Sequence, residues 1–303
     1  MNRLIFGTSY LAMNFVALLL NLLVSYVILT TKDYISCSSY KILVQVNVTL
    51  LIQIVIHILT SAKTIFSLNF DLWTEKSIGA VLNFAWLNTM SLSLLLALDR
   101  FYVIVFSIKI SRKKWIEITA TVIAWLPGCC LLIFDLTPFT GYVFDAVVVD
   151  WIYQNGTLTD FAQRFEQVVT FSSLIGSFIL YILIFAYIAK HSRSKAELRI
   201  LIIAVLSFFY VCLQECVYQF GSFWLETSEA ADMGVNTMFT AYPLFCQILH
   251  LMFSRKVRKT IVAKLLCRNA IEDGSTTAQV IHIRLIGWSQ ETSTGNSRSC
   301  FRF

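Results

Sequence analysis

Seven long stretches with almost no charged side chains constrain this sequence more than any other feature. The hydrocarbon core of a bilayer is about 30 Å thick, and a helix needs roughly 20 mostly apolar residues to cross it. The stretches span residues 4–31, 42–62, 77–98, 118–134, 167–189, 200–225 and 233–254. One acid, Glu215, interrupts the sixth. The apolar residues run continuously instead of alternating with polar ones, which excludes the strands of a membrane barrel.

The composition agrees with a membrane protein. Hydrophobic residues make up 57% of the chain and charged residues 14%, whereas soluble domains carry about 25% charged residues. The first stretch is too long for the roughly 7–15-residue apolar core of a secretory signal peptide, so it is interpreted as a retained span. We therefore predict an all-α membrane protein, folded as a seven-transmembrane helix bundle.

Basic residues are divided unevenly between the two sides of this bundle. Four of the 24 Lys and Arg residues, Arg3, Lys63, Lys76 and Arg164, fall on one side, and all others fall on the opposite side. Short loops rich in Lys and Arg stay in the cytoplasm, so the N-terminus of this multi-pass plasma-membrane protein is predicted outside. The sequon at Asn155 then lies outside as a predicted glycosylation site. The basic side faces the anionic inner leaflet, and the charge requires no nucleic-acid partner.

An amphipathic segment follows the seventh stretch. In "SRKVRKTIVAKLLC" a helix places Val257, Ile261 and Leu265 on one face, with basic residues on the others. Such a helix lies in the membrane interface, and Cys267 at its end is a candidate for palmitoylation or a free thiol. We predict a receptor domain over 1–268 that includes this helix, and a disordered cytoplasmic tail over 269–303. The apolar part of that tail, 279–288, has no physical explanation.

An acid and a base, Asp99 and Arg100, stand side by side where the third stretch ends. Such a pair at the mouth of a span can stabilise one packing of the bundle, and release of the arginine gives a second packing. The plainer alternative is an ion pair that only anchors the helix end.

The triplet Asp99-Arg100-Phe101 stands where rhodopsin-like receptors carry Asp/Glu-Arg-Tyr. Pro243 and Phe253 have the spacing between that family's Asn-Pro-x-x-Tyr proline and the aromatic residue that opens helix eight. With seven spans and an external N-terminus, the chain resembles a G-protein-coupled receptor. The segments "SSYKIL" and "LALDRF" are similar to the divergent nematode serpentine chemoreceptors of class T or class X. No cysteine opens the third span, so that family's usual extracellular disulfide cannot form.

The resemblance implies a heterotrimeric G protein as partner, with the freed Arg100 contacting its α subunit. Glu197, at the base of the sixth span, could complete a lock with Arg100, or could pair locally with Arg193 or Arg199 as surface charges commonly do. The resemblance implies no cofactor and no enzymatic activity. The cysteine spacing makes a metal site improbable.

Glu215 is the one carboxylate inside a span, and intramembrane charges normally face the bundle interior and mark functional sites. Tyr218 shares its helical face and Gln219 lies beside it. Asn83, Trp86 and Met90 of the third span and Tyr242 of the seventh are expected to line the same small-molecule pocket. For the aromatic residues and Met90 the alternative is ordinary packing, and for Glu215 it is a protonated, hydrogen-bonded carboxyl.

We predict a G-protein-coupled, chemosensory-type receptor for an external small molecule or peptide. The alternative is a seven-helix transporter or channel, which favours internal repeats, broken helices and several intramembrane charges. The sequence has one intramembrane acid, three prolines and no detected repeat. A retinal-binding protein would need a lysine in 233–254, and that stretch contains none.

Overall fold

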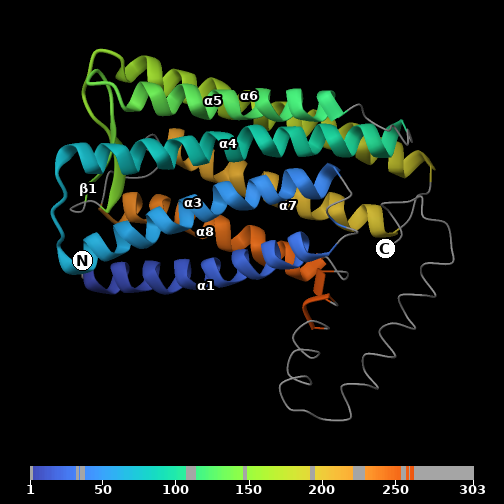
Figure 1. The fold of residues 1–303 in the computed structure, drawn as a ribbon, viewed down its shortest axis with the longest axis horizontal. Coiled ribbons are helices and arrows are strands. Elements are labelled where there is room, and N and C mark those ends of the chain that lie inside the picture. Colours follow the sequence, from blue (N-terminus) through green and yellow to red (C-terminus); the bar gives the residue numbers. More distant parts are fainter. Residues whose placement is uncertain are drawn as a thin grey trace, which may run out of the picture.

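The computed structural model describes residues 3–31, 34, 38–106, 114–145, 149–191, 195–220, 229–253, 257–258 and 260–262. In this part of the chain, seven long helices lie side by side (Figure 1). They are α1 (Arg3–Thr30), α3 (Ser38–Phe66), α4 (Leu72–Val105), α5 (Lys114–Asp135), α6 (Thr159–His191), α7 (Lys195–Phe220) and α8 (Glu229–Phe253). Each predicted span corresponds to one of these helices, so the seven-helix prediction is confirmed.

The outer surface of the bundle is apolar, as lipid contact requires. Five helices (α1, α3, α4, α5 and α6) are long and apolar enough to cross a membrane, and α7 contributes a described apolar stretch, Val205–Tyr218. Large apolar side chains such as Ile133 of α5 and Val168 of α6 are two-thirds exposed on the protein surface. These exposed faces are the ones that hydrocarbon covers in a bilayer.

Helix α4 occupies the centre of the bundle, where it packs against α3, α5 and α6. The N-cap of this helix is Asp71, whose carboxylate accepts a hydrogen bond of 3.1 Å from the backbone N–H of Thr74. The hydrogen bonds from Thr74 hold the pKa of Asp71 below its usual value. Within the bundle, Thr89 of α4 accepts a hydrogen bond from Gln53 and bonds to Thr49, both of α3. Buried polar side chains therefore join neighbouring helices in the interior of the bundle.

A second polar cluster joins α1, α3 and α8. Asn47 of α3 accepts a hydrogen bond of 3.1 Å from Gln247 of α8 and donates one of 3.3 Å to Ser25 of α1. Asn21 of α1 donates to the backbone carbonyl of Asn47 at 3.2 Å. The first and seventh spans are thus fixed beside the second by side-chain hydrogen bonds.

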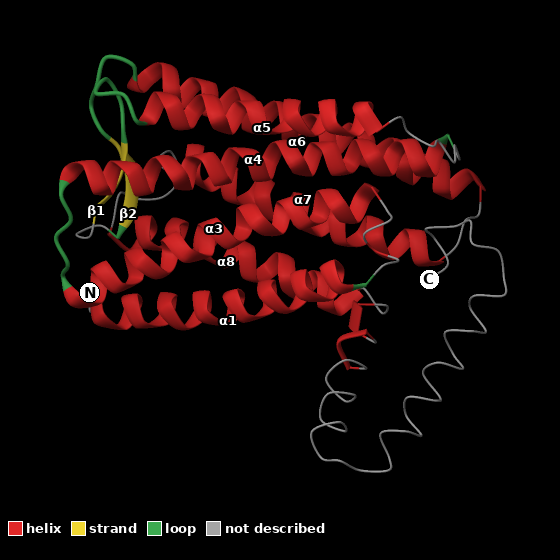
Figure 2. Cartoon of the chain, viewed as in Figure 1, coloured by secondary structure: helices red, strands yellow, loops and turns green. Residues whose placement is uncertain are grey.

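The connection between α5 and α6 forms an antiparallel hairpin that the sequence did not predict. Strand β1 (Tyr142–Asp145) pairs with β2 (Asp150–Tyr153) at the end of the bundle where the chain begins (Figure 2). We call this end the outer end and the opposite end the inner end. Phe144, Val149 and Trp151 are buried against α1, α3, α4 and α8. Val149 adopts a left-handed φ of 59°. The hairpin therefore covers the outer end of the bundle.

At the inner end, described residues that follow α8 pack on the bundle. Val257 and Ile261 are buried in a cluster with Val24, Tyr34 and Leu43, whereas Val262 is exposed. For these described residues the predicted amphipathic face of the segment after the seventh span is confirmed. Leu265, Cys267 and the tail over 269–303 lie outside the described residues, so the domain boundary at 268 stays a prediction.

Candidate functional site

The Asp-Arg-Phe triplet lies at the inner end of α4, as predicted. The Asp99 side chain is almost fully buried and accepts a hydrogen bond from the hydroxyl of Ser39 at the start of α3. This hydrogen bond directs the carboxylate toward the neighbouring helix α3.

Arg100 is partly buried among groups from four helices. Its guanidinium interacts electrostatically with Asp99 of its own helix, with Tyr40 of α3 and with Tyr181 of α6. His250 of α8 also lies within its electrostatic reach. Groups of α3, α4, α6 and α8 thus lie within electrostatic reach of this side chain, so a change in its position would alter its interactions with four helices.

The remaining residues predicted for the switch, Phe101, Pro243 and Glu197, lie on α4, α8 and α7. Phe101 packs edge-on against Tyr102 and Phe106, with ring centroids 6.2 and 5.7 Å apart. Pro243 is buried inside α8. Glu197 lies in the first turn of α7, and its side chain is outside the described part of the structure. The predicted lock between Glu197 and Arg100 stays a prediction.

Aromatic residues predicted for the ligand pocket meet in the bundle interior. Trp86 and Met90 of α4 and Tyr242 of α8 belong to one buried cluster. The ring of Trp86 packs edge-on against Tyr242 at 5.9 Å and against Phe239 at 5.2 Å. The structure therefore brings Trp86, Met90 and Tyr242 together. Their buried, close packing also fits the alternative of ordinary helix contacts.

The predicted residues of α7 divide between the interior and the hairpin. Glu215 is 3% exposed, so the intramembrane carboxyl faces the protein as expected. Tyr218 packs edge-on against Phe239 at 5.3 Å and forms a hydrogen bond with Tyr142 of the hairpin. The side chain of Gln219 lies outside the described part of the structure.

Asn83 does not join this interior cluster. Its amide donates hydrogen bonds of 2.9 Å to Asp135 at the end of α5 and to Tyr153 of β2. The Tyr153 hydroxyl in turn donates to Glu166 of α6 at 2.6 Å. Burial, together with the negative charge of Glu166, raises the pKa of Tyr153, which keeps its hydroxyl protonated. Asn83 thus connects the hairpin to the bundle at the outer end.

Asp135, Tyr153 and Glu166 were missed in the sequence analysis. The two acids border the fourth and fifth uncharged stretches. Their position at the edges of spans was a usable signal, because an acid there must find partners or water. The hairpin that brings them together has no such signal in the sequence.

Further polar contacts hold the hairpin over the outer end. Lys63 of α3 is 6% exposed, pairs with Glu75 of α4 at 2.5 Å and donates to the backbone carbonyl of Phe144 at 3.1 Å. Asn236 of α8 donates to the backbone carbonyl of Val149 at 2.7 Å. Phe144 and Val149 are therefore held in buried positions at the outer end of the bundle.

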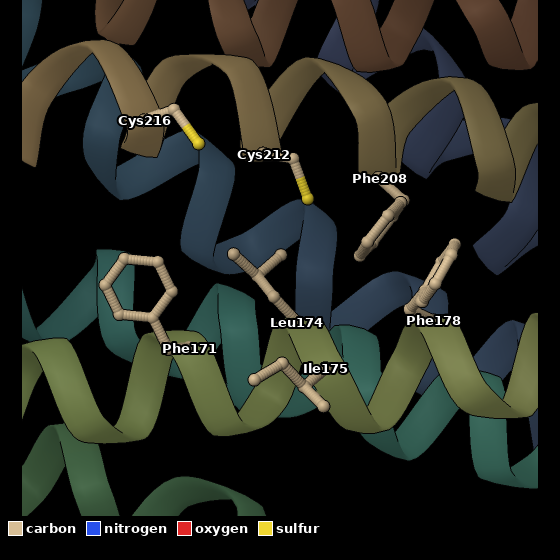
Figure 3. Close-up of a pocket in the computed structure, with 7 residues that line it drawn as sticks. All are labelled: Phe171, Leu174, Ile175, Phe178, Phe208, Cys212 and Cys216. Atoms are coloured by element: carbon tan, nitrogen blue, oxygen red, sulfur yellow. The ribbon is translucent and has the colours of Figure 1, made fainter. Parts of the chain in front are cut away.

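An apolar cavity of about 130 Å³ lies between α6 and α7 (Figure 3). Phe171, Leu174, Ile175 and Phe178 of α6 form one wall. Phe208, Cys212 and Cys216 of α7 form the other. No polar surface lines it. It lies beside the aromatic cluster, because Leu174 belongs to both.

Comparison with solved structures identifies the architecture. The crystal structure of squid rhodopsin superposes on this chain with a TM-score of 0.74 and 13% sequence identity, covering 86% of this chain and 84% of that one. The chain has the rhodopsin fold. No known family model matches the sequence, and no curated protein matches it.

The rhodopsin fold is reached here with different side chains. The seventh helix, α8, contains no lysine. The cysteines described by the structure, at positions 129, 130, 212, 216 and 246, are free thiols. Hydrogen bonds and the Lys63–Glu75 ion pair hold the loop between the fourth and fifth spans in place.

Proposed function

We propose that this protein is a G-protein-coupled receptor. The observation that carries the proposal is the position of the Asp99-Arg100-Phe101 triplet at the inner end of the third span of a rhodopsin fold. In this proposal Arg100 changes its position between two packings of the bundle, and in one of them it contacts the α subunit of a heterotrimeric G protein. A ligand that binds one packing more tightly shifts the population toward it.

A continuous path of packed side chains supports coupling from the interior to Arg100. Phe208 of α7 packs against both the aromatic cluster of Trp86 and an inner cluster that contains Tyr181. Phe101 packs against that same inner cluster. A ligand that displaces Phe208 would therefore act on residues that touch the triplet.

The finer features of the receptor are also proposals. The chain is a chemosensory-type receptor of the plasma membrane, of the nematode serpentine type, that binds an external small molecule or peptide. Asn155, which is exposed between β2 and α6, carries a glycan. Cys267 carries a palmitoyl group, and Glu215 with Tyr218 and Gln219 contributes polar contacts to the ligand.

The test is guanine-nucleotide exchange on a panel of G-protein α subunits by receptor reconstituted in lipid nanodiscs. Wild-type receptor is expected to accelerate exchange on at least one subunit, and Arg100→Ala is expected to abolish this acceleration. Arg164→Ala is the matched control, because it removes an exposed arginine from the outer end of α6. Equal activity of the two variants would refute the role of Arg100. Solute flux without exchange on any subunit would favour a transporter.

A further inference from the structure

The cavity between α6 and α7 opens on the hydrocarbon side of the bundle. Ile175 is 59% exposed and Phe178 is 43% exposed, and both lie on the α6 face that continues into exposed Ile179 and Ile182. This face is the surface that contacts lipid. The opening of the cavity therefore faces the hydrocarbon interior of the bilayer, and molecules dissolved among the acyl chains reach it directly.

The described hairpin residues cover the outer end of the bundle. Phe144, Val149 and Trp151 are buried against residues of the helices beneath them. Lys63 and Asn236 hold this cover through backbone carbonyls. A molecule that enters past these residues from the external water would have to displace them, whereas a molecule in the bilayer would displace only lipid.

The size and lining of the cavity select what it can hold. Its volume is about 130 Å³, with no polar lining surface. In another protein, an engineered cavity of roughly 150 Å³ lined by Leu, Ile and Phe stays dry and binds benzene. A charged or strongly polar ligand would lose its hydration here without any compensating hydrogen bond from the lining.

We propose that the cavity between α6 and α7 binds a small uncharged apolar molecule, of about the size of benzene, that arrives from the bilayer. Phe178 and Phe208 stack across the two helices with centroids 5.3 Å apart and an interplanar angle of 12°. The occupant lies beside this stacked pair, between the two helices. Its effect on signalling through Phe208 rests on the proposed receptor function, but its binding does not.

The experiment measures binding directly. Fluorobenzene is added to purified receptor in nanodiscs, and its ¹⁹F resonance is followed against empty nanodiscs of the same lipid. Wild-type receptor is expected to show saturable binding that benzene displaces. Ile175→Trp places a large ring at the cavity opening and is expected to weaken binding by about tenfold or more. Ile182→Trp, two turns further along the same exposed face of α6, is the matched control and is expected to bind like wild type.

Two outcomes would overturn the site. Uptake by wild-type receptor that equals uptake by empty nanodiscs, without displacement by benzene, would show partitioning only. Equal effects of the two tryptophan substitutions would show that binding occurs elsewhere. Both outcomes are distinct from failure of the receptor proposal, which is measured by nucleotide exchange. A receptor that drives exchange but binds no fluorobenzene refutes the cavity site alone.

Discussion

The two ends of the bundle are held in different ways. At the outer end, four side-chain hydrogen bonds and a buried apolar face attach one hairpin to α3, α4, α6 and α8. The Lys63–Glu75 ion pair between α3 and α4 holds the lysine that makes one of these bonds. At the inner end, Asp99 is attached to α3 through Ser39, and Arg100 interacts electrostatically with Tyr40, Asp99 and Tyr181, with His250 also in reach. The hairpin at the outer end is thus held by directed hydrogen bonds from several helices. In the proposed receptor function, the inner end is where the second packing forms.

Polar contacts hold the external loop in place, and the cysteines of the described residues are free thiols. Directed hydrogen bonds to backbone carbonyls fix the hairpin in position, and the Lys63–Glu75 pair lies where little water competes. A pair that is largely removed from water depends on both partners, because the loss of one leaves an uncompensated charge. The outer end should therefore respond strongly to single substitutions.

The largest effect is expected from Lys63→Met. This substitution leaves Glu75 without its ion-pair partner and the carbonyl of Phe144 without its donor, and it should lower the free energy of unfolding by about 3 kcal/mol. Lys41→Met is the control, because the Lys41–Glu117 pair is longer, at 3.5 Å, and Lys41 is half-exposed. It should cost less than about 1 kcal/mol. Thermal unfolding in detergent would measure both, and equal losses would contradict the ranking of the two ion pairs.

Gly79→Ala tests the close approach of the hairpin to α4. A Cβ at Gly79 would lie 1.8 Å from the backbone carbonyl oxygen of Tyr142, so the hairpin would have to move, at a cost of about 1–3 kcal/mol. Gly234→Ala in α8 is the matched control, because a Cβ there meets no atom within 4 Å. It should be neutral, or stabilising by up to about 1 kcal/mol through helix propensity. Similar melting temperatures for the two variants would mean that the hairpin does not rest on α4.

Tyr153→Phe removes the hydroxyl that bonds to both Asn83 and Glu166. The loss should be about 1–2 kcal/mol, because Glu166 is left with one hydrogen bond fewer in a poorly hydrated place. Tyr26→Phe on α1, whose side chain is 56% exposed, serves as the control and should change stability by less than about 0.5 kcal/mol. If the Tyr153→Phe protein were as stable as the control, the hydrogen bonds of Tyr153 would not stabilise the outer end.

Ser39→Ala is expected to have the smallest effect on stability, at about 1 kcal/mol, but it should change signalling. Without the Ser39 hydroxyl, Asp99 is held less firmly, and the packing that frees Arg100 becomes more populated. Ligand-independent nucleotide exchange should rise by about fivefold, which corresponds to about 1 kcal/mol. Ser172→Ala, an exposed serine on α6, should leave basal exchange unchanged. Unchanged basal exchange in Ser39→Ala would contradict a restraining role for that hydrogen bond.

The sequence predicted the helices of the bundle better than the hairpin at its outer end. Long uncharged stretches predict helices because the hydrocarbon core contains no water to bond the backbone, and a helix satisfies the backbone hydrogen bonds within one segment. The helical spacing of Val257 and Ile261 likewise predicted that they share one face, although that face packs on the bundle and was expected to lie in the membrane interface. These features depend on local pattern, which a single sequence contains.

Other parts depend on contacts between distant residues. The strands over 142–145 and 150–153 are four residues each, too short for a clear alternating pattern, and their burial depends on the bundle beneath them. Asn83 was assigned to the ligand pocket by its span and depth, but its partners Asp135 and Tyr153 come from elements whose positions only tertiary structure determines. No spacing in the sequence links these three residues.

Hydrogen–deuterium exchange with and without a nucleotide-free G protein tests the contrast between the two ends most directly. The account predicts that amide protection changes at the inner ends of α4 and α6, over 97–106 and 180–191, while the amides of β1 and β2 exchange as before. The opposite result, in which the hairpin changes its protection and the inner ends do not, would contradict it.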